Sequence, residues 1–176
     1  MGRLKAKVAL VTGGASGIGL GICEAFVREG AHVILTDIIK AGAGPKAIMN
    51  FQSGGSISYQ NLDVTDEDQW GKAISYVRRK FGQLDILVNN AGAIPGGSID
   101  LIDETRWREA CDLKVFGYIN MCRRAYARMQ QDRGGVIVNV IGAAGERPTP
   151  GYVAGAGGNA SLMAITRALG GHSRQD

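Results

Sequence analysis

The sequence predicts an α/β protein with an open, parallel, doubly wound sheet and helices on both faces. Short runs of apolar, often β-branched residues alternate along the chain with longer segments of helical periodicity, which is the pattern of repeated strand–helix–strand units. The short runs are almost continuously apolar, as expected for parallel strands that are covered on both faces. Right-handed crossovers then place the helices on the two faces of one sheet.

Each element is expected for a local reason. The predicted strands are the apolar runs at residues 7–12, 32–37, 57–63, 85–90 and 135–140. The predicted helices are the amphipathic segments at residues 17–29, 66–81, 103–131 and 158–170. The stretch 40–56 has weak helical character because it contains several glycines and Pro45. No linker, repeat or low-complexity segment interrupts the chain, so residues 1–176 are expected to form a single domain.

Composition and charge exclude several classes of function. The net charge is only +4 and the basic side chains are scattered, so we expect no nucleic-acid partner. The 3 cysteines show no Cys-x-x-Cys spacing and the 2 histidines lie far apart, so we expect neither disulfides nor a metal site. No apolar run approaches the roughly 20 residues of a membrane span, so we expect no membrane contact and a cytoplasmic location.

A glycine-rich segment, TGGASGIG at residues 12–19, ends the first predicted strand and opens the first predicted helix. Its glycines leave out the side chains that would block a pyrophosphate, and the helix offers free N–H groups and the positive end of its dipole. The residues expected to bind the cofactor here are Thr12, Gly13, Ser16, Gly17, Ile18 and Gly19. The alternative is a glycine-rich turn that only lets the helix pack closely.

An acidic residue, Asp37, closes the second predicted strand, at about the distance of 20 residues that dinucleotide-binding units use. Its carboxylate can accept hydrogen bonds from the two hydroxyls of an adenosine ribose. A 2′-phosphate would be repelled by that charge, and no arginine stands beside it in the sequence. The sequence therefore predicts NAD as the cofactor in preference to NADP.

Several segments, in the same order along the chain, together resemble the short-chain dehydrogenase/reductase family. They are the TGxxxGxG motif at 12–19, LDVTD at 62–66, the Asn-Asn-Ala-Gly motif at 89–92 and the strand GVIVNV at 135–140. The resemblance implies a Rossmann-type fold. It also implies that the cofactor contacts Asp63 and Val64 at its adenine, and Asn90, Ala91 and Gly92 after the fourth strand.

The family's catalytic set of serine, tyrosine, lysine and asparagine is not found at the matching positions. In register with the family, the serine position holds Gly142, the tyrosine position Gly155 and the lysine position Asn159. The asparagine position holds Lys114, and the nearest tyrosine, Tyr152, comes three residues before Gly155. The chain thus resembles an atypical member of the family.

Two functions are compatible with this pattern. The first is an oxidoreductase that transfers a hydride between nicotinamide and an alcohol/carbonyl pair, with a relocated catalytic set of Tyr152, Asn159 and Lys114. Lys114 would supply positive charge, Asn159 would hold the ribose, and Tyr152 would act as the acid if Lys114 lowers its pKa. The alternatives without a catalytic role are that Lys114 extends to solvent and that Tyr152 only caps its loop. The second function is a catalytically inactive, NAD-binding regulatory or structural subunit.

The resemblance also bears on partners and length. Family members associate through the helices that correspond to 103–131 and 158–170, so we expect a homodimer or homotetramer that acts on a small alcohol or carbonyl substrate. Family members continue through further strands, and we expect the chain to lack the last of them. The remaining sheet would have the order 3-2-1-4-5, with its fifth strand at an edge.

Overall fold

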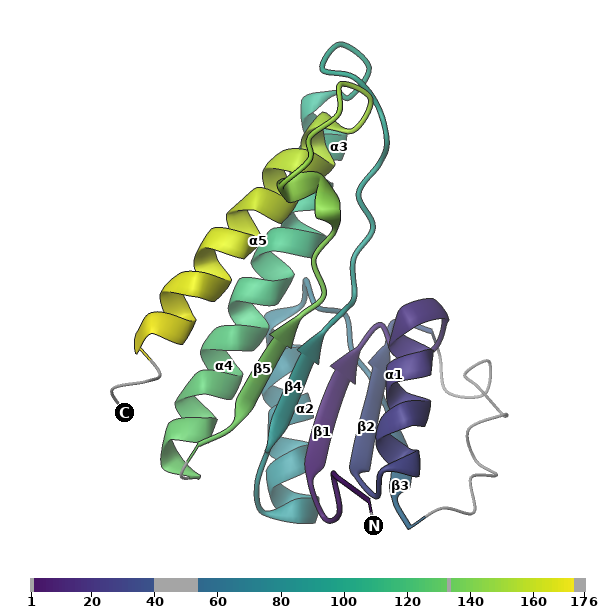
Figure 1. The fold of residues 1–176 in the computed structure, drawn as a ribbon, viewed down its shortest axis with the longest axis vertical. Helices are drawn as coiled ribbons and strands as arrows, with labels where there is room; N and C mark the ends of the chain where they lie inside the picture. Colours follow the sequence, from purple (N-terminus) through teal and green to yellow (C-terminus); the bar gives the residue numbers. More distant parts are fainter. Residues whose placement is uncertain (1, 40–53, 133, 173–176) are drawn as a thin grey trace. The chain divides into compact units, whose positions relative to one another are not determined.

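A computed structural model of the protein describes residues 2–39, 54–132 and 134–172. Its strands are β1 (Val8–Thr12), β2 (His32–Asp37), β3 (Ser56–Asn61), β4 (Ile86–Asn89) and β5 (Val136–Asn139) (Figure 1). They form a 5-stranded sheet of order β3-β2-β1-β4-β5, and the registered pairs β1–β2, β1–β4 and β2–β3 are all parallel. The predicted fold class and strand order are therefore confirmed.

The helices follow the predicted segments with two differences. They are α1 (Gly17–Arg28), α2 (Glu67–Phe81), α3 (Glu104–Cys111), α4 (Gly117–Gln131) and α5 (Val153–His172). A π-helical segment, Asp112–Phe116, joins α3 to α4, so the helix predicted over 103–131 is not uniform. The predicted start of the last helix, residue 158, was wrong because α5 begins at Val153. Gly155 and Gly158 are buried in it, so packing outweighs their low helical propensity. The predicted weak helix at 40–56 lies mostly outside the described residues.

The chain divides into two compact units. The first consists of Met1–Ala91 and Asn120–Val138, and it carries most of the sheet with α1, α2 and most of α4. The second consists of Gly92–Ile119 and Asn139–Asp176, and it carries α3, the π-helical segment and α5. The single domain expected over 1–176 stays a prediction.

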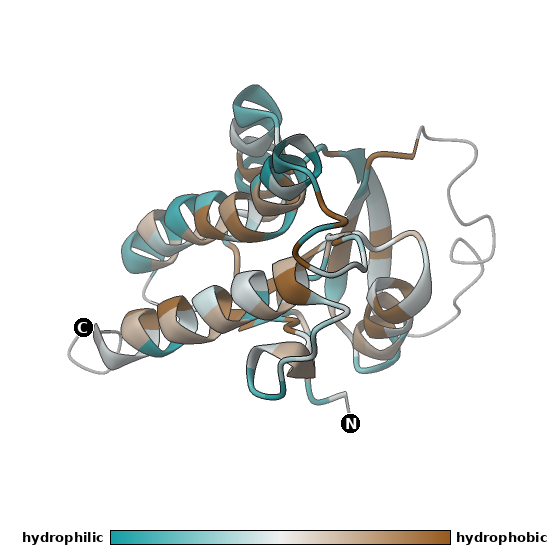
Figure 2. Ribbon diagram, turned by 90° about the horizontal axis from the view of Figure 1, so that it is seen from above, coloured by the Kyte–Doolittle hydropathy of each residue, from teal (hydrophilic) through white to brown (hydrophobic). Residues whose placement is uncertain are grey.

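The core of the first unit lies where the sheet meets its helices. Strand β1 is buried over its whole length and β2 over its four central residues. Figure 1 shows α1 in front of the sheet and α2 behind it. Cys23 and Val27 of α1 are buried, as are Ala73 and Val77 of α2, while each helix also carries hydrophilic stretches (Figure 2). The amphipathic periodicity of the sequence thus produces a sheet covered on both faces.

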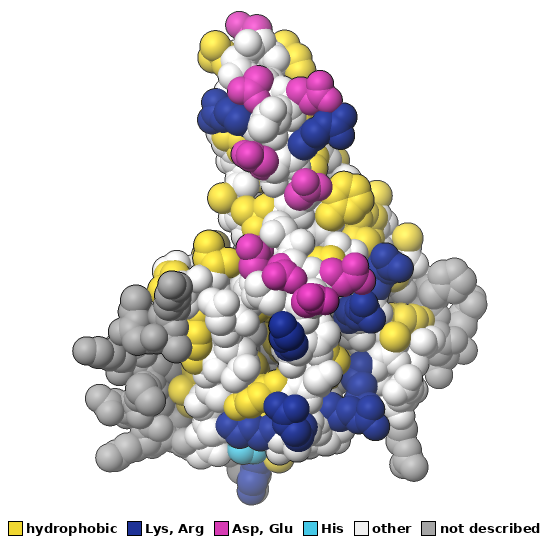
Figure 3. Space-filling view, turned by 180° about the vertical axis from the view of Figure 1, so that it is seen from behind, with side chains coloured by type: hydrophobic (Ala, Val, Ile, Leu, Met, Phe, Trp, Pro, Cys, Tyr) yellow, Lys and Arg dark blue, Asp and Glu magenta, His cyan; other side chains and the backbone are white. Residues whose placement is uncertain are grey.

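Charge is distributed along α2 in the direction that stabilises a helix. Acidic residues occupy its first turn, and Arg78, Arg79 and Lys80 its last. Figure 3, which views the molecule from behind, shows in its lower half a group of acidic side chains above a group of basic ones. Acidic side chains near a helix N-terminus and basic ones near its C-terminus complement the helix dipole. The order of charges along α2 therefore stabilises the helix.

Candidate functional site

In the first unit, the predicted cofactor-binding residues gather at the carboxyl ends of neighbouring strands. Thr12 ends β1, and its hydroxyl accepts hydrogen bonds from the N–H groups of Asn90 at 3.0 Å and Ala91 at 3.1 Å. The Asn90 side-chain amide donates in return to the carbonyl oxygens of Thr12 at 3.2 Å and Gly13 at 3.0 Å. These bonds fasten the glycine-rich turn to the segment after β4. Crevices that bind ligands occur at this edge of open parallel sheets.

The glycines of the turn serve two different purposes. A Cβ on Gly13 would lie 2.8 Å from the Cα of Ala91, and one on Gly19 would lie 2.1 Å from the Gly13 carbonyl oxygen. Both glycines are therefore needed for close backbone packing. Gly17 has a φ of +52°, and nothing lies within 4 Å of a Cβ built on it, so its backbone faces open space. Ser16 precedes it at the start of α1 and makes no capping bond with its side chain.

This start of α1 fits the pyrophosphate of a dinucleotide. The uncapped N-terminus and the open Gly17 position leave backbone N–H groups and the positive end of the helix dipole for an anion. Ile18, which is 67% exposed, adds an apolar surface at the same turn. The packing explanation thus accounts for Gly13 and Gly19 but not for Gly17.

Asp37 lies at the end of β2, and its carboxylate faces the glycine-rich turn. One carboxylate oxygen accepts the N–H of Ala15 at 3.0 Å, and the other accepts the N–H of Ile39 at 3.4 Å. A carboxylate offers about four acceptor positions, so acceptors remain for the hydroxyls of a ribose. The side chain is half-buried and therefore still open on one side.

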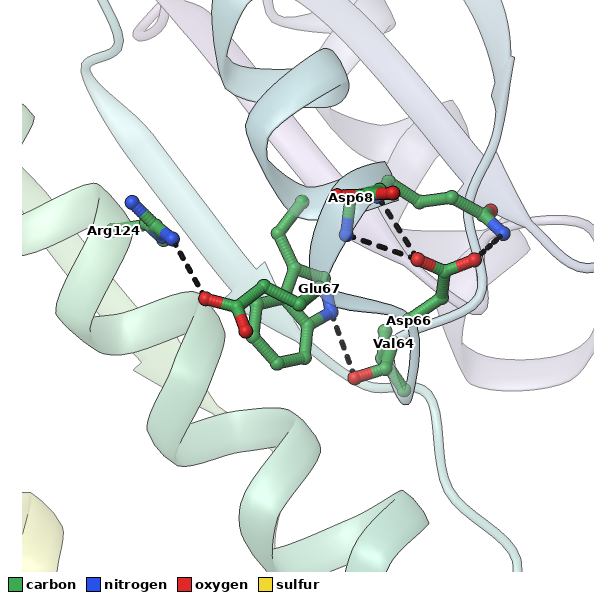
Figure 4. Close-up of polar contacts among 7 residues, drawn as sticks. Val64, Asp66, Glu67, Asp68 and Arg124 are labelled. Atoms are coloured by element: carbon green, nitrogen blue, oxygen red, sulfur yellow. Dashed lines mark hydrogen bonds and ion pairs between the residues drawn. The ribbon is translucent and has the colours of Figure 1, made fainter.

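The turn expected to receive the adenine is held by a residue that the sequence reasoning missed. The indole N–H of Trp70 donates to the Val64 carbonyl oxygen at 2.8 Å (Figure 4). One oxygen of Asp63 accepts both the N–H and the hydroxyl of Thr65, at 2.9 and 2.7 Å. The Val64 carbonyl is thereby occupied, which leaves its N–H as the backbone group for a base. Asp66 fixes the following helix by accepting from two N–H groups of its first turn (Figure 4).

In the second unit, Lys114 lies in the π-helical segment and turns inward. Its ammonium donates to the hydroxyl of Tyr118 at 2.7 Å and to the carbonyl oxygen of Val140 at 3.0 Å. Its stem crosses Gly92, where a Cβ would lie 2.4 Å from the Lys114 Cδ. Burial lowers the pKa of Lys114 to about 8. The solvent-directed alternative for Lys114 was therefore wrong.

Tyr152 occupies the space that a side chain at position 155 would need. A Cβ on Gly155 would lie 2.0 Å from Cε1 of the Tyr152 ring. The backbone on either side of Tyr152 is bonded to Gly97, which donates to Gly151 at 2.8 Å and accepts from Val153 at 3.4 Å. The predicted pairing of Lys114 with Tyr152 does not occur among the described contacts, where Lys114 bonds to Tyr118 and Val140.

Asn159 is 2% exposed and joins the loop after β5 to α5. Its side-chain oxygen accepts the N–H of Gly142 at 2.8 Å, and its side-chain nitrogen donates to the carbonyl oxygen of Gly155 at 2.7 Å. Both ends of the amide are engaged, so the structure gives Asn159 a fastening role. Contact between Asn159 and the cofactor stays a prediction.

The sequence reasoning also missed Tyr118. The available signal was its spacing, since it follows Lys114 by four residues and side chains so spaced meet on a helix. Among residues 2–39, 54–132 and 134–172, no group of three or more His, Cys, Asp or Glu side chains could hold a metal ion. No helix of that part of the chain is long and apolar enough to cross a membrane.

The chain is similar to several known proteins. The family model described as short chain dehydrogenase matches residues 7–175. The 3-oxoacyl-(acyl-carrier-protein) reductase FabG of Thermotoga maritima is 33% identical over 165 residues, which are 94% of this chain and 67% of that protein. Galactitol 2-dehydrogenase of Agrobacterium fabrum is 39% identical over 146 residues, which are 82% of this chain and 56% of that protein.

Solved structures show the same relationship. The crystal structure of a short-chain dehydrogenase/reductase from Burkholderia xenovorans matches with a TM-score of 0.89 at 33% identity, and the match covers 96% of this chain and 69% of that one. The chain therefore spans 56% to 69% of the length of these three proteins. The two named enzymes are a reductase and a dehydrogenase, so the family is one of oxidoreductases. The chain belongs to the short-chain dehydrogenase family.

Proposed function

We propose that the protein is an oxidoreductase that transfers a hydride between NAD and an alcohol or carbonyl substrate through a non-standard active site. The observation that carries the proposal is the inward-turned Lys114, whose pKa burial lowers to about 8. A half-buried ammonium without a carboxylate partner costs stability. An inactive subunit that only binds NAD would gain nothing from keeping it, whereas a proton-transferring enzyme would.

The cofactor site of the proposal lies in the glycine-rich turn and the neighbouring strand ends. Thr12, Gly13, Ser16, Gly17, Ile18 and Gly19 would hold the pyrophosphate. Asp37 would hold the adenosine ribose, Asp63 and Val64 the adenine, and Asn90, Ala91 and Gly92 the remaining part. The nicotinamide, when bound, supplies or accepts the hydride. The fastened turn and the open Gly17 position support this assignment.

The proposed chemistry of the chain's own residues depends on an exchange of residue types. In register with the family, Lys114 stands where an asparagine is expected, and Asn159 stands where a lysine is expected. The positive charge has thus moved from α5 to the π-helical segment. Asn159 holds the loop at Gly142, and Tyr152, whose ring lies on Gly155, is the candidate for orienting the substrate oxygen.

A substrate panel tests the proposed activity. The protein is incubated with NAD and a series of small alcohols, and with NADH and the matching ketones and aldehydes, while nicotinamide absorbance is followed. We expect slow but saturable turnover that Lys114→Met abolishes without loss of NAD binding in calorimetric titration. Tight NAD binding with no turnover across the panel would favour the inactive regulatory or structural subunit.

The cofactor preference has a separate test at Asp37. We expect NAD to bind at least tenfold more tightly than NADP, a difference of about 1.4 kcal/mol, because the carboxylate repels a 2′-phosphate. Asp37→Ala is expected to narrow that ratio, whereas Asp68→Ala, which removes the same charge from the exposed first turn of α2, leaves it unchanged. Equal affinities of the unaltered protein for the two nucleotides would contradict the role of Asp37.

We also propose a homodimer or homotetramer in the cytoplasm. In the second unit, Ile99, Leu101 and Phe116 expose between 53% and 69% of their surface, which is apolar area that a partner copy could cover. Cys23, Cys111 and Cys122 form no disulfide, as is usual in a reducing compartment. A monomer in sedimentation at micromolar concentration would contradict the association.

A further inference from the structure

Lys114 and Tyr118 form a hydrogen-bonded pair, and the structure defines which of them is the donor and which is the acceptor. The Tyr118 side chain is almost fully buried, and its hydroxyl donates to the Val140 carbonyl oxygen at 2.9 Å. A phenolic hydroxyl has one hydrogen, so its lone pairs are left for another donor. The Lys114 ammonium fills that place at 2.7 Å. Tyr118 therefore accepts from Lys114 and cannot itself give a proton to a substrate.

The surroundings leave one ammonium hydrogen of Lys114 for a further acceptor. An ammonium has three N–H donors, and those to Tyr118 and Val140 use two of them. The stem is fixed by Gly92, because any larger residue there would collide with the Lys114 Cδ. The Tyr118 ring lies 4.4 Å from the Lys114 Nζ, which adds a cation–π contact.

No charged side chain among the described residues compensates Lys114. The segments packed on it present a glycine at Gly92 and a backbone carbonyl at Val140, and the titratable group bonded to it on its own helical run is Tyr118. Helix α5 carries one described charged residue, Arg167, which pairs with Glu146. Burial alone accordingly lowers the pKa of Lys114 to about 8. A group that titrates there can both give and take a proton near neutral pH.

We propose that Lys114 is the proton donor and acceptor of the reaction, and that Tyr118 is the positioning residue that holds its ammonium. The inference deepens the proposed function and rests on it. In reduction, the hydride of NADH adds to the carbonyl carbon, a Lys114 N–H bond breaks and an O–H bond forms, which leaves alcohol, NAD⁺ and a neutral amine. In oxidation, the neutral amine takes the hydroxyl proton as the hydride leaves.

A titration of Lys114 tests the pair without any turnover. The protein is prepared with lysine labelled with ¹³C at Cε, and the Cε resonance of Lys114, assigned by its loss in Lys114→Arg, is followed against pH in the protein without cofactor. We expect a midpoint near 8. Tyr118→Phe is expected to move it lower by half a unit or more, because the charged form loses an acceptor. Tyr126→Phe, two turns further along α4, is the matched control and leaves the midpoint unchanged.

Steady-state kinetics test the chemical role of Lys114. Lys114→Arg keeps the positive charge but cannot be deprotonated, so we expect a loss of kcat of at least 100-fold, as for removal of a general acid. Tyr118→Phe is expected to lower kcat about tenfold with KM changed less than twofold, and to shift the pH profile of reduction in the same direction as the Lys114 midpoint. Reduction in the unaltered protein should fall as pH rises through about 8.

The outcomes separate this inference from the function on which it rests. Turnover that survives in Lys114→Arg, or a Lys114 midpoint that Tyr118→Phe does not move, would overturn the inference and leave the proposed oxidoreductase standing. Absence of turnover in the unaltered protein, with a Lys114 midpoint that still responds to Tyr118→Phe, would overturn the proposed function and the chemical role of Lys114 with it.

Discussion

The glycine-rich turn of the first unit and the start of α5 in the second unit are both crowded with glycines, but the neighbours of these glycines differ. A Cβ on Gly19 would collide with a backbone carbonyl oxygen at 2.1 Å. A Cβ on Gly155 would collide with the ring of Tyr152 at 2.0 Å, and a side chain can rotate away. In the first region the backbone itself requires the small residue, whereas in the second a neighbouring side chain has filled the space. One region is therefore rigidly specified, and the other is open to substitution.

The largest expected effect comes from Gly19→Ala. The added methyl group would force the glycine-rich turn apart, so we expect NAD affinity to fall at least 100-fold, or about 2.8 kcal/mol, and the free energy of unfolding to fall by about 1–3 kcal/mol. Calorimetric titration and urea denaturation measure the two quantities. Gly21→Ala is the matched control, because nothing lies within 4 Å of a Cβ there. Unchanged NAD affinity in Gly19→Ala would contradict this prediction, because it would show that the backbone of the turn can move to accommodate a methyl group.

A smaller effect, of opposite sign, is expected for Lys114→Met. The pKa of Lys114 falls from 10.5 to about 8 on folding, so Lys114 is protonated in a larger fraction of unfolded chains between these values, and its contribution to stability rises with pH across that window. Below pH 8 Lys114 is charged in both states, and the folded protein bears the full free-energy cost of burying that charge. Lys114→Met removes it, and the free energy of unfolding at pH 7 should rise by about 2 kcal/mol.

Urea denaturation at several pH values measures this effect. The difference in unfolding free energy between Lys114→Met and the unaltered protein should shrink as pH rises from 8 to 10.5, while Lys72→Met, at an exposed site on α2, should show a constant difference. Tyr118 keeps its bond to Val140 in the variant, so no buried polar group is left unpaired. A destabilised Lys114→Met at pH 7 would mean that the lysine is retained for structure.

The smallest effect is expected for Gly155→Ala, which is the direct counterpart of Gly19→Ala. The Tyr152 ring has to rotate, but alanine is a better helix former than glycine by about 1 kcal/mol, so the net change in unfolding free energy should stay below about 1 kcal/mol. Denaturation by urea gives that number. The changed environment of Tyr152 should appear in near-ultraviolet circular dichroism. A loss as large as that of Gly19→Ala would mean that the Tyr152 ring is fixed in place.

Local patterns were sufficient to predict the sheet. Strand β2 was predicted at its observed bounds, because a buried parallel strand is apolar at nearly every position. Strand β5 was predicted to within one residue at each end from its apolar run, although Val136 and Val138 are exposed. The start of α5 was predicted five residues late. Its early glycines have poor helical propensity in isolation, and only their burial against the rest of the second unit makes that stretch helical.

The same distinction applies to the candidate site. The positions of Thr12, Gly19 and Asp37 follow from a motif that is contiguous in sequence or set at a fixed distance along one strand–helix–strand unit. The contacts of Lys114 could not be predicted in this way, because Val140 and Gly92 are far from it in sequence and meet it only through the tertiary fold. Whether a lysine is withdrawn from water depends on such distant neighbours, and periodicity does not report them.

Because Lys114 lies in the π-helical segment Asp112–Phe116, the direction of its side chain depends on the number of residues in that segment. Its defining bond, from the Gly117 N–H to the Asp112 carbonyl, spans one residue more than an α-helical bond. Each residue of an α-helix advances the chain by about 100° around the axis. Deletion of a single residue such as Phe116 would let the segment return to α-helical bonding and would change the angle between Lys114 and Tyr118 around the helix axis. The hydrogen bond between Lys114 and Tyr118 is therefore sensitive to the number of residues in this segment, even when both side chains are unchanged.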